Sequence, residues 1–147
     1  MITARTLEFD ADLGAPPGRA FAAITEGRHL ERWFCDACES EPEEGGRLTM
    51  RWHRPGSSSM PYEATWIEFE PPERCSCRGG HEGYPNRDAG LIEFSLAPRG
   101  EGSRLHVRHV MPGGPAYESF EAAYRGAWPR ALARLARYLQ PTAGAPS

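Results

Sequence analysis

Hydrophobic and polar residues alternate along much of the chain, with the period of two that is typical of β-strands. The first such stretch is RTLEFDADL at residues 5–13, and the longest is the pair of arms around an RGEG turn in residues 91–112. Shorter stretches, separated by turns such as residues 54–61, predict strands within residues 37–46, 47–54, 62–73 and 74–82. The pattern therefore predicts one strand near the N-terminus and six more after residue 36.

Helical periodicity occurs in three places. Apolar residues recur at helical spacing in residues 17–27 and again in residues 28–34, so two short helices should follow the first strand. A longer run with a period near 3.6 covers residues 116–139, and Pro129 inside it predicts a kink or a break between two helical pieces. The order of elements indicates an α+β fold in which one long amphipathic helix covers an antiparallel sheet. If the sheet curls round that helix, the space between them is a cavity.

Length, composition and charge favour one soluble domain. The chain has 147 residues, of which 39% are hydrophobic and 25% charged, so it can bury a core without disulfides. We expect a single domain over residues 1–140 and a flexible tail at residues 141–147. A net charge of −3 argues against a nucleic-acid partner. Neither a membrane span nor a signal peptide is visible, so we expect a cytoplasmic protein with no membrane partner.

Six segments, in one unbroken order, resemble a known family. They read APPGRAFAAIT, HLERWF, EEGGRLTMRW, ATWIEFEPPERCSC, LIEFSLAPRGEGSRLHVRH and GAWPRALARLARYL. In this order they resemble the START-like (SRPBCC, helix-grip) superfamily, in its branch of activator of heat-shock protein 90 ATPase homologues. The resemblance implies a curved seven-stranded antiparallel sheet wrapped round a long C-terminal helix, two short helices after the first strand, and a pocket between sheet and helix. Ala64, Trp66 and Ser103 depart from the family's usual residues, and the bulk of Trp66 would reshape the pocket.

The resemblance implies three functions, between which the fold alone does not choose. We expect a protein that binds a small hydrophobic or aromatic molecule without catalysis and without a cofactor. The alternative is an enzyme resembling polyketide cyclases and aromatases, with an acid or base in the pocket. A chaperone-interacting, co-chaperone-like domain is a third hypothesis. An exposed edge strand also leaves a homodimer open.

The expected pocket is rich in aromatic residues. Alternation along the hairpin places Phe94, Val107 and His109 on the face that meets the long helix. The short helices, the middle strands and the long helix add the rest, so the expected lining is Trp33, Phe34, Trp52, Trp66, Phe94, Val107, His109, Tyr117, Phe120, Tyr124 and Trp128. Aromatic rings with polar tips suit an apolar pocket with a few orienting groups, although each ring alone suits a packed core equally well.

His109 and Glu68 are the candidate acid–base residues. An inward histidine needs a hydrogen-bond partner and is able to act as a general base, but the alternative is a core histidine with satisfied hydrogen bonds. An inward Glu68 beside an apolar wall would have a raised pKa, and the alternatives are a structural ion pair with an arginine or a surface position. The catalytic residues, if there are any, stay undetermined by the sequence.

The four cysteines form a Cys35-x-x-Cys38 and a Cys75-x-Cys77 pair. Together they would make a four-thiolate zinc site, but two cysteines one residue apart in a strand lie about 6.6 Å apart on one face. A thioredoxin-like redox site is disfavoured, because its Cys-x-x-Cys begins a helix and this one follows a helix. We expect no metal site, and four thiols that act as small hydrophobic side chains.

Overall fold

The structure is a computed structural model, and it describes residues 4–53 and 61–140. The turn expected around residues 54–61 falls, except for Pro61, outside the described residues. The expected tail at residues 141–147 also lies outside them.

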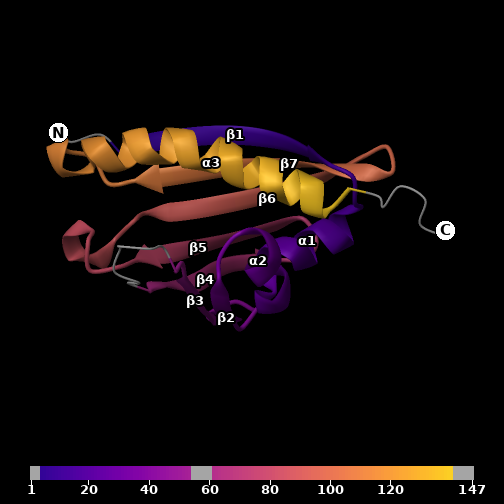
Figure 1. The fold of residues 1–147 in the computed structure, drawn as a ribbon, viewed down its shortest axis with the longest axis horizontal. Helices are drawn as coiled ribbons and strands as arrows, with labels where there is room; N and C mark the ends of the chain where they lie inside the picture. Colours follow the sequence, from indigo (N-terminus) through magenta and orange to yellow (C-terminus); the bar gives the residue numbers. More distant parts are fainter. Residues whose placement is uncertain (1–3, 54–60, 141–147) are drawn as a thin grey trace.

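The order of elements predicted from the sequence is confirmed (Figure 1). Two single-turn 3₁₀ helices, η1 and η2, were not expected. In chain order the elements are β1 (Arg5–Leu13), α1 (Pro17–Thr25), α2 (Gly27–Trp33), β2 (Ala37–Ser40), β3 (Arg47–Arg51), β4 (Tyr62–Glu70), β5 (Arg74–Gly80), η1 (Pro85–Arg87), β6 (Leu91–Arg99), β7 (Gly102–Met111), η2 (Pro115–Tyr117) and α3 (Glu118–Tyr138).

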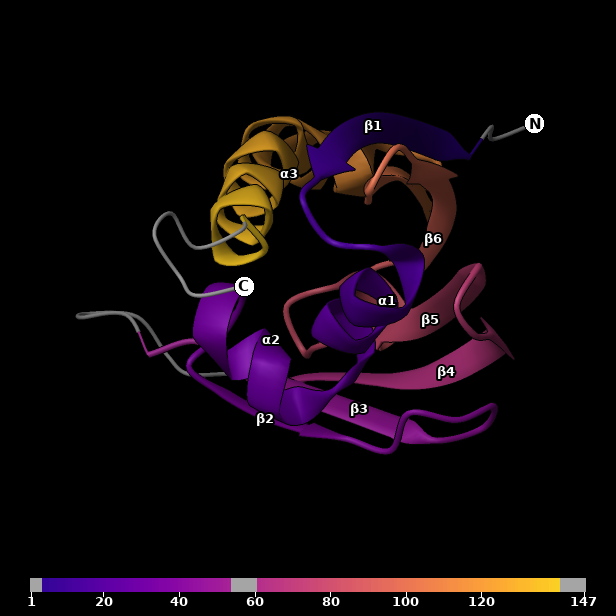
Figure 2. The ribbon, with the colours of Figure 1, turned by 90° about the vertical axis from the view of Figure 1, so that its right-hand side faces the viewer.

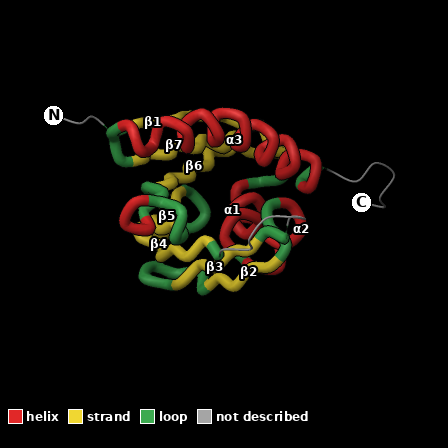
Figure 3. Tube along the Cα trace, turned by 60° about the vertical axis from the view of Figure 1, so that its left-hand side comes forward, coloured by secondary structure: helices red, strands yellow, loops and turns green. Residues whose placement is uncertain are grey.

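The strands form one antiparallel sheet of seven in the order β1-β7-β6-β5-β4-β3-β2. The sheet curls from β1 to β2, and all three α-helices lie on its concave side (Figure 2). α3 runs beside β1, α1 contacts β6 and β7, and α2 lies against β2 at the other end of the sheet (Figure 3). This is the helix-grip, START-like architecture that the sequence indicated.

Alternation in β6 and β7 separates a buried face from a charged face. Phe94 is paired with Val107 in the sheet, and both side chains are buried. One residue earlier in β6, Glu93 points to the outer face, where Arg108 donates to its carboxylate at 2.7 Å. A one-residue slip in register would exchange these two faces, so burial of one face fixes the register.

The long C-terminal helix is continuous, and the break considered at Pro129 is absent. Proline removes one backbone donor, so the carbonyl of Arg125 loses its hydrogen bond within the helix. Both Pro129 and Arg125 are exposed, and water is able to satisfy that carbonyl. The helix therefore tolerates the proline on its solvent side.

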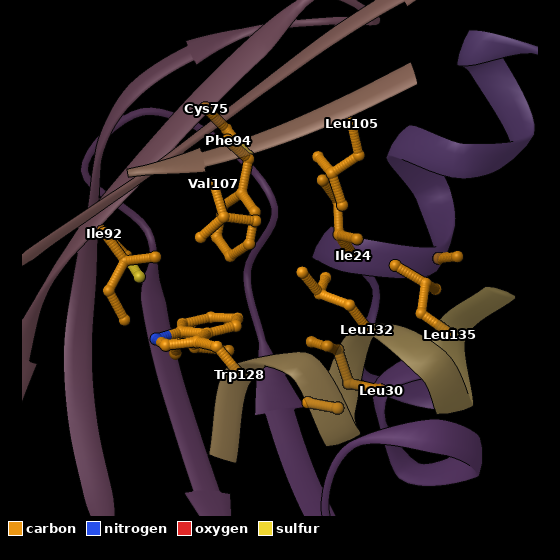
Figure 4. Close-up of a cluster of buried hydrophobic side chains, with 14 of the residues drawn as sticks. Ile24, Leu30, Cys75, Ile92, Phe94, Leu105, Val107, Trp128, Leu132 and Leu135 are labelled. Carbon is orange, nitrogen blue, oxygen red and sulfur yellow. The ribbon is translucent and has the colours of Figure 1, made fainter. Parts of the chain in front are cut away.

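Leucine and isoleucine side chains join the helices to the sheet at one end of the core. Leu132 and Leu135 of α3 point toward Ile24 of α1, Leu30 of α2 and Leu105 of β7 (Figure 4). All five are buried, and Leu105 and Leu135 are completely so. Burial of one such side chain contributes roughly 1.5–3 kcal/mol. This cluster fixes the position of α3 over the sheet.

Candidate functional site

A cavity of about 420 Å³ lies between α3 and the concave face of the sheet. This volume falls within the range of roughly 300–1,000 Å³ that is common for small-molecule sites. The lining comes from α3, from strands β3, β4 and β6, and from the segments that follow α2, β3 and β5. It consists of Phe34, Met50, Trp52, Tyr62, His81, Tyr84, Ile92, Phe120, Ala123, Tyr124, Ala127, Trp128, Ala131 and Arg134.

One stripe of α3 forms the long wall of this cavity. Residues three or four positions apart lie on the same side of a helix. The stripe alternates large and small side chains, and its alanines are Ala123, Ala127 and Ala131. Because alanine stops at Cβ, these three positions leave space where larger residues would reach the sheet. The cavity therefore follows from the small residues of α3 as much as from the aromatic ones.

Trp128 is held in place by His109. The Trp128 indole Nε1 donates to His109 Nδ1 at 3.1 Å, so Nδ1 is the acceptor and Nε2 carries the hydrogen. Nε2 in turn donates to the backbone oxygen of Ala89 at 2.8 Å. Burial lowers the pKa of His109, whose side chain has no exposed surface. His109 is therefore a neutral core histidine with both ring nitrogens engaged.

An aromatic group closes one side of the cavity. Phe34 lies stacked between Trp33 and Trp128, with ring centroids 4.9 Å and 6.1 Å away. Trp52 meets Phe34 edge-on, and its indole Nε1 donates to the Phe34 backbone oxygen at 2.6 Å. The indole N–H groups of Trp52 and Trp128 thus donate to other groups of the protein. The faces of the aromatic rings remain available for apolar contacts with a ligand.

Tyrosine hydroxyls supply polar groups inside the cavity. The hydroxyls of Tyr84 and Tyr124 are hydrogen-bonded at 2.5 Å, and Tyr62 lies 4.0 Å from the Cys77 sulfur. Burial raises the pKa of each of the three tyrosines. They stay protonated at neutral pH and can orient a ligand by hydrogen bonding.

His81 adds an imidazole at the mouth of the cavity. Its Nδ1 accepts a hydrogen bond from the Gly83 backbone N–H at 2.8 Å, so the neutral ring carries its hydrogen on Nε2. Partial burial lowers the pKa of His81, which keeps the ring neutral near pH 7. The ring also lies 4.5 Å from the ring of Tyr84. His81 borders a second, smaller hollow that also includes Glu63 and the ion pair of Glu82 with Arg87.

The sequence matches the model of one known protein family. Residues 14–140 match the family described as activator of Hsp90 ATPase homolog 1-like protein. The chain belongs to this family. A search of curated proteins finds no match to it.

Solved structures of other proteins show the same fold. A protein from Chromobacterium violaceum is 24% identical, with 93% of this chain and 98% of that chain covered and a TM-score of 0.77. An Aha1 dimer from Colwellia psychrerythraea is 16% identical, with 92% and 96% covered and a TM-score of 0.75. CalU16 from Micromonospora echinospora is 24% identical, with 94% and 78% covered and a TM-score of 0.73. At these identities the likeness concerns the fold. Among the described helices, none combines the length and apolarity needed to cross a bilayer.

In this family member, part of the expected lining reaches the cavity. Phe34, Trp52, Phe120, Tyr124 and Trp128 all line it. The remaining expected residues do not, and all of them are buried elsewhere in the core: Trp33, Trp66, Phe94, Val107, His109 and Tyr117.

The six expected residues that do not line the cavity take part in core packing and in hydrogen bonds to the backbone or to other side chains. The indole of Trp33 donates to the Ala23 carbonyl at 2.8 Å, and that of Trp66 donates to Ser40 Oγ at 3.1 Å. Tyr117 belongs to η2, and its hydroxyl donates to backbone carbonyls of the loop before β6. Phe94 and Val107 pair within the sheet, and Phe94 also meets Trp128 edge-on (Figure 4). Trp66 accordingly does not reshape the cavity.

Of the positions considered for Glu68, the structure shows the surface position with an arginine partner and not the inward one. The β4–β5 pairing shifts register between Trp66 and Phe69, so Phe69 rather than Glu68 turns toward the core. The Glu68 side chain is 47% exposed and lies 3.2 Å from Arg74 Nε. Glu68 and His109 therefore do not converge on one point in the cavity.

The cysteines do not meet as a group of four. Cys38 is on β2 and Cys75 and Cys77 are on β5, and β3 and β4 lie between these strands. Within residues 4–53 and 61–140, no three His, Cys, Asp or Glu side chains are placed to share a metal ion. Burial raises the pKa of Cys77 to about 12 and also raises that of Cys75. These two thiols behave as buried apolar groups.

Several lining residues were missed by the sequence analysis: Met50, Tyr62, His81, Tyr84, Ile92, Ala123, Ala127, Ala131 and Arg134. For Ile92 a signal existed, because it alternates with Phe94 on the inward face. For Arg134 it also existed, since Arg134 follows Ala127 and Ala131 at helical spacing. His81 and Tyr84 lie after β5 in a segment without periodicity, so no pattern marks them as inward.

Proposed function

We propose that this protein binds a small hydrophobic or aromatic molecule in the cavity between α3 and the sheet, without catalysing a reaction. The observation that carries the proposal is an empty volume of about 420 Å³ whose walls are mainly aromatic and aliphatic. Filling such a volume with packed side chains would stabilise the fold, because an apolar void forfeits dispersion contacts. A ligand that fills this volume would supply those contacts.

The cyclase-like alternative has less support. The residues considered for acid–base catalysis are His109, with both nitrogens engaged, and Glu68, which lies outside the cavity. The tyrosines that do line the cavity have pKa values raised by burial, so none is a base at neutral pH. Their geometry favours orienting a ligand over transferring a proton. The co-chaperone-like hypothesis stays a prediction, since it concerns the outer surface and not this cavity.

A titration with N-phenyl-1-naphthylamine tests the binding proposal, because this neutral probe becomes fluorescent in an apolar site. Ala127→Leu places three extra carbons in the cavity on a helix that accepts leucine as readily as alanine. We expect this variant to weaken probe binding by about tenfold, which corresponds to roughly 1.4 kcal/mol. Phe120→Ala, which removes a cavity wall, should also weaken binding, and more than Cys77→Ser.

Ala133→Leu is the matched control, since Ala133 is exposed on the same helix outside the cavity. It should bind the probe as the wild type does. Equal affinities of the Ala127→Leu and Ala133→Leu variants would contradict the proposal. Native mass spectrometry of the freshly purified protein adds a direct measurement, because retained mass would identify a molecule already bound.

We also propose that two copies of the chain associate. The sheet has two edges, β1 and β2, and unpaired edges offer backbone groups to a second chain. A structural relative from Colwellia psychrerythraea is described as a dimer. Sedimentation equilibrium would decide this, and a single species with the mass of one chain at high concentration would reject it.

A further inference from the structure

We propose that the molecule bound in this cavity is an anion: a hydrophobic or aromatic body with one acidic group that pairs with Arg134. The inference rests on the proposed binding function and goes further, because it assigns the charge of the ligand and the residue that recognises it.

Arg134 uses only one of its hydrogen-bond donors for a contact within the described part of the protein. Its Nε donates to the backbone oxygen of Trp33 at 3.0 Å, which fixes the guanidinium against the end of α2. A guanidinium has five N–H donors, so four remain on the two terminal nitrogens. The ion pairs formed among the described residues do not include Arg134. The group is therefore held by one bond and free to form a two-point contact with a carboxylate or sulfonate.

Arg134 also determines the charge of the cavity. Among the described residues of the lining, it is the one that is ionised at neutral pH. The imidazole of His81 and the tyrosine hydroxyls are neutral, and the lining includes no carboxylate. Arg134 is exposed, so with a neutral ligand its guanidinium would bond only to water and to the Trp33 carbonyl. An anionic ligand would gain charge-assisted hydrogen bonds there.

The distribution of charge around the cavity sets the orientation of the ligand. Phe120 and Arg134 mark the two ends of the α3 stripe, and fourteen residues of helix correspond to roughly 21 Å. At the His81 end, the neighbouring hollow is lined by Glu63, Glu82 and Arg87, and Arg87 donates to the Glu82 carboxylate at 2.7 Å, so the cation there already has an acidic partner. The acidic group therefore belongs at the Arg134 end. The apolar body extends toward Phe120, past the alanines and the ring of Trp128.

The competing explanation is that Arg134 only joins α3 to α2 through the Trp33 carbonyl. Two probes that differ in charge separate this structural role from ligand recognition. 8-Anilinonaphthalene-1-sulfonate and N-phenyl-1-naphthylamine share one ring system, and only the first carries a sulfonate. Both are titrated by fluorescence against the wild type, Arg134→Gln, Arg134→Lys and Arg137→Gln. Arg137 is exposed on α3 and does not line the cavity, so its variant makes the same charge change elsewhere.

We expect Arg134→Gln to weaken binding of the sulfonate probe by about tenfold, or roughly 1.4 kcal/mol, and to change binding of the neutral probe less than twofold. Arg134→Lys should recover part of the sulfonate affinity, and Arg137→Gln should bind both probes as the wild type does. An equal loss for both probes would show a structural role and overturn the inference. No loss for either probe, or an equal loss of sulfonate binding in Arg137→Gln, would overturn it too.

The two proposals fail in different ways. If the wild type binds the neutral probe but its sulfonate affinity does not depend on Arg134, the anion inference is wrong and the binding function stands. If the wild type binds neither probe, the binding function is wrong and the inference falls with it. Thermal melting of each variant shows whether a loss of binding reflects a loss of fold.

Discussion

Replacing His109 with phenylalanine tests the hydrogen-bonded pair at the centre of the structure. Phenylalanine keeps a ring of similar size in the sheet but has no polar atom. The change would leave the Trp128 indole N–H and the Ala89 carbonyl without their partners, and both are buried with the residues that carry them. We therefore expect His109→Phe to destabilise the protein although it makes a buried position more hydrophobic.

The magnitude follows from the two orphaned groups. A buried polar group that loses its partner costs about 1–3 kcal/mol, so the two together should cost about 2–6 kcal/mol. The ring volume is nearly unchanged, so no large cavity term adds to this loss. Domains of this kind are stable by about 5–15 kcal/mol, which leaves the variant folded and measurable. With a mid-range urea slope of about 2 kcal/mol per molar, the midpoint should fall by roughly 1–3 M.

The pH dependence of the free energy of unfolding, compared between wild type and His109→Phe, tests whether His109 is buried and neutral. Burial lowers the pKa of His109 in the folded protein, whereas the unfolded chain has the ordinary value near 6.5. Below about pH 6.5, His109 binds a proton in the unfolded state but not in the folded state. The wild type therefore loses stability as the pH falls. The slope reaches at most about 1.4 kcal/mol per pH unit. His109→Phe lacks this contribution, and the other histidines titrate in both proteins.

The assay is urea unfolding followed by far-ultraviolet circular dichroism at several pH values between 7.5 and 5.5. The stability difference between wild type and His109→Phe should be largest at pH 7.5 and shrink toward pH 5.5. A difference below about 0.5 kcal/mol at pH 7.5 would refute the argument from orphaned groups. A difference that stays constant or widens as the pH falls would refute the neutral, buried assignment of His109.

Two further predictions concern backbone contacts and thiols. A Cβ on Gly79 would lie 1.9 Å from the Glu63 backbone oxygen, so Gly79→Ala should cost about 1–3 kcal/mol or more in thermal unfolding. Gly18→Ala meets no atom within 4 Å and should be neutral or stabilising by up to about 1 kcal/mol; equal effects at the two sites would contradict the clash. Cys38 is half-buried and a hydrogen bond with Cys35 lowers its pKa, so one thiol should react rapidly with 5,5′-dithiobis(2-nitrobenzoate) in native protein. Cys38→Ser should abolish that rapid phase, and a rapid phase that survives the substitution would reject the assignment.

Much of the fold could be predicted from local periodicity. The alternation of β1 and of the β6–β7 hairpin, and the 3.6-residue period of α3, follow from the requirement that one side of each element is buried. These are properties of neighbouring residues, so the sequence shows them directly. At Pro129 the sequence left a kink or a break open, and the exposed position of the proline explains why the helix continues.

The candidate site was less accessible to sequence reasoning. Periodicity correctly assigned His109 to the buried face, but it did not show that both ring nitrogens are engaged. It left the position of Glu68 open, because a register shift in β4 interrupts the alternation. Tyr84 comes from a segment without any period, yet its hydroxyl meets that of Tyr124, forty positions later.

The sequence by itself determined which faces are apolar, the order of the elements and the family to which they belong. Only the tertiary structure decided which inward side chains touch one another and which border empty space. The contact of Arg134 with the Trp33 carbonyl joins positions 101 residues apart. The cavity likewise combines the alanines of α3 with residues of β3, β4 and β6 that are distant in the sequence. A pattern of apolar residues predicts which side chains are buried, because burial depends on the chemistry of each side chain itself. It does not record how much volume the opposing segments fill, because packing depends on residues far away in the chain.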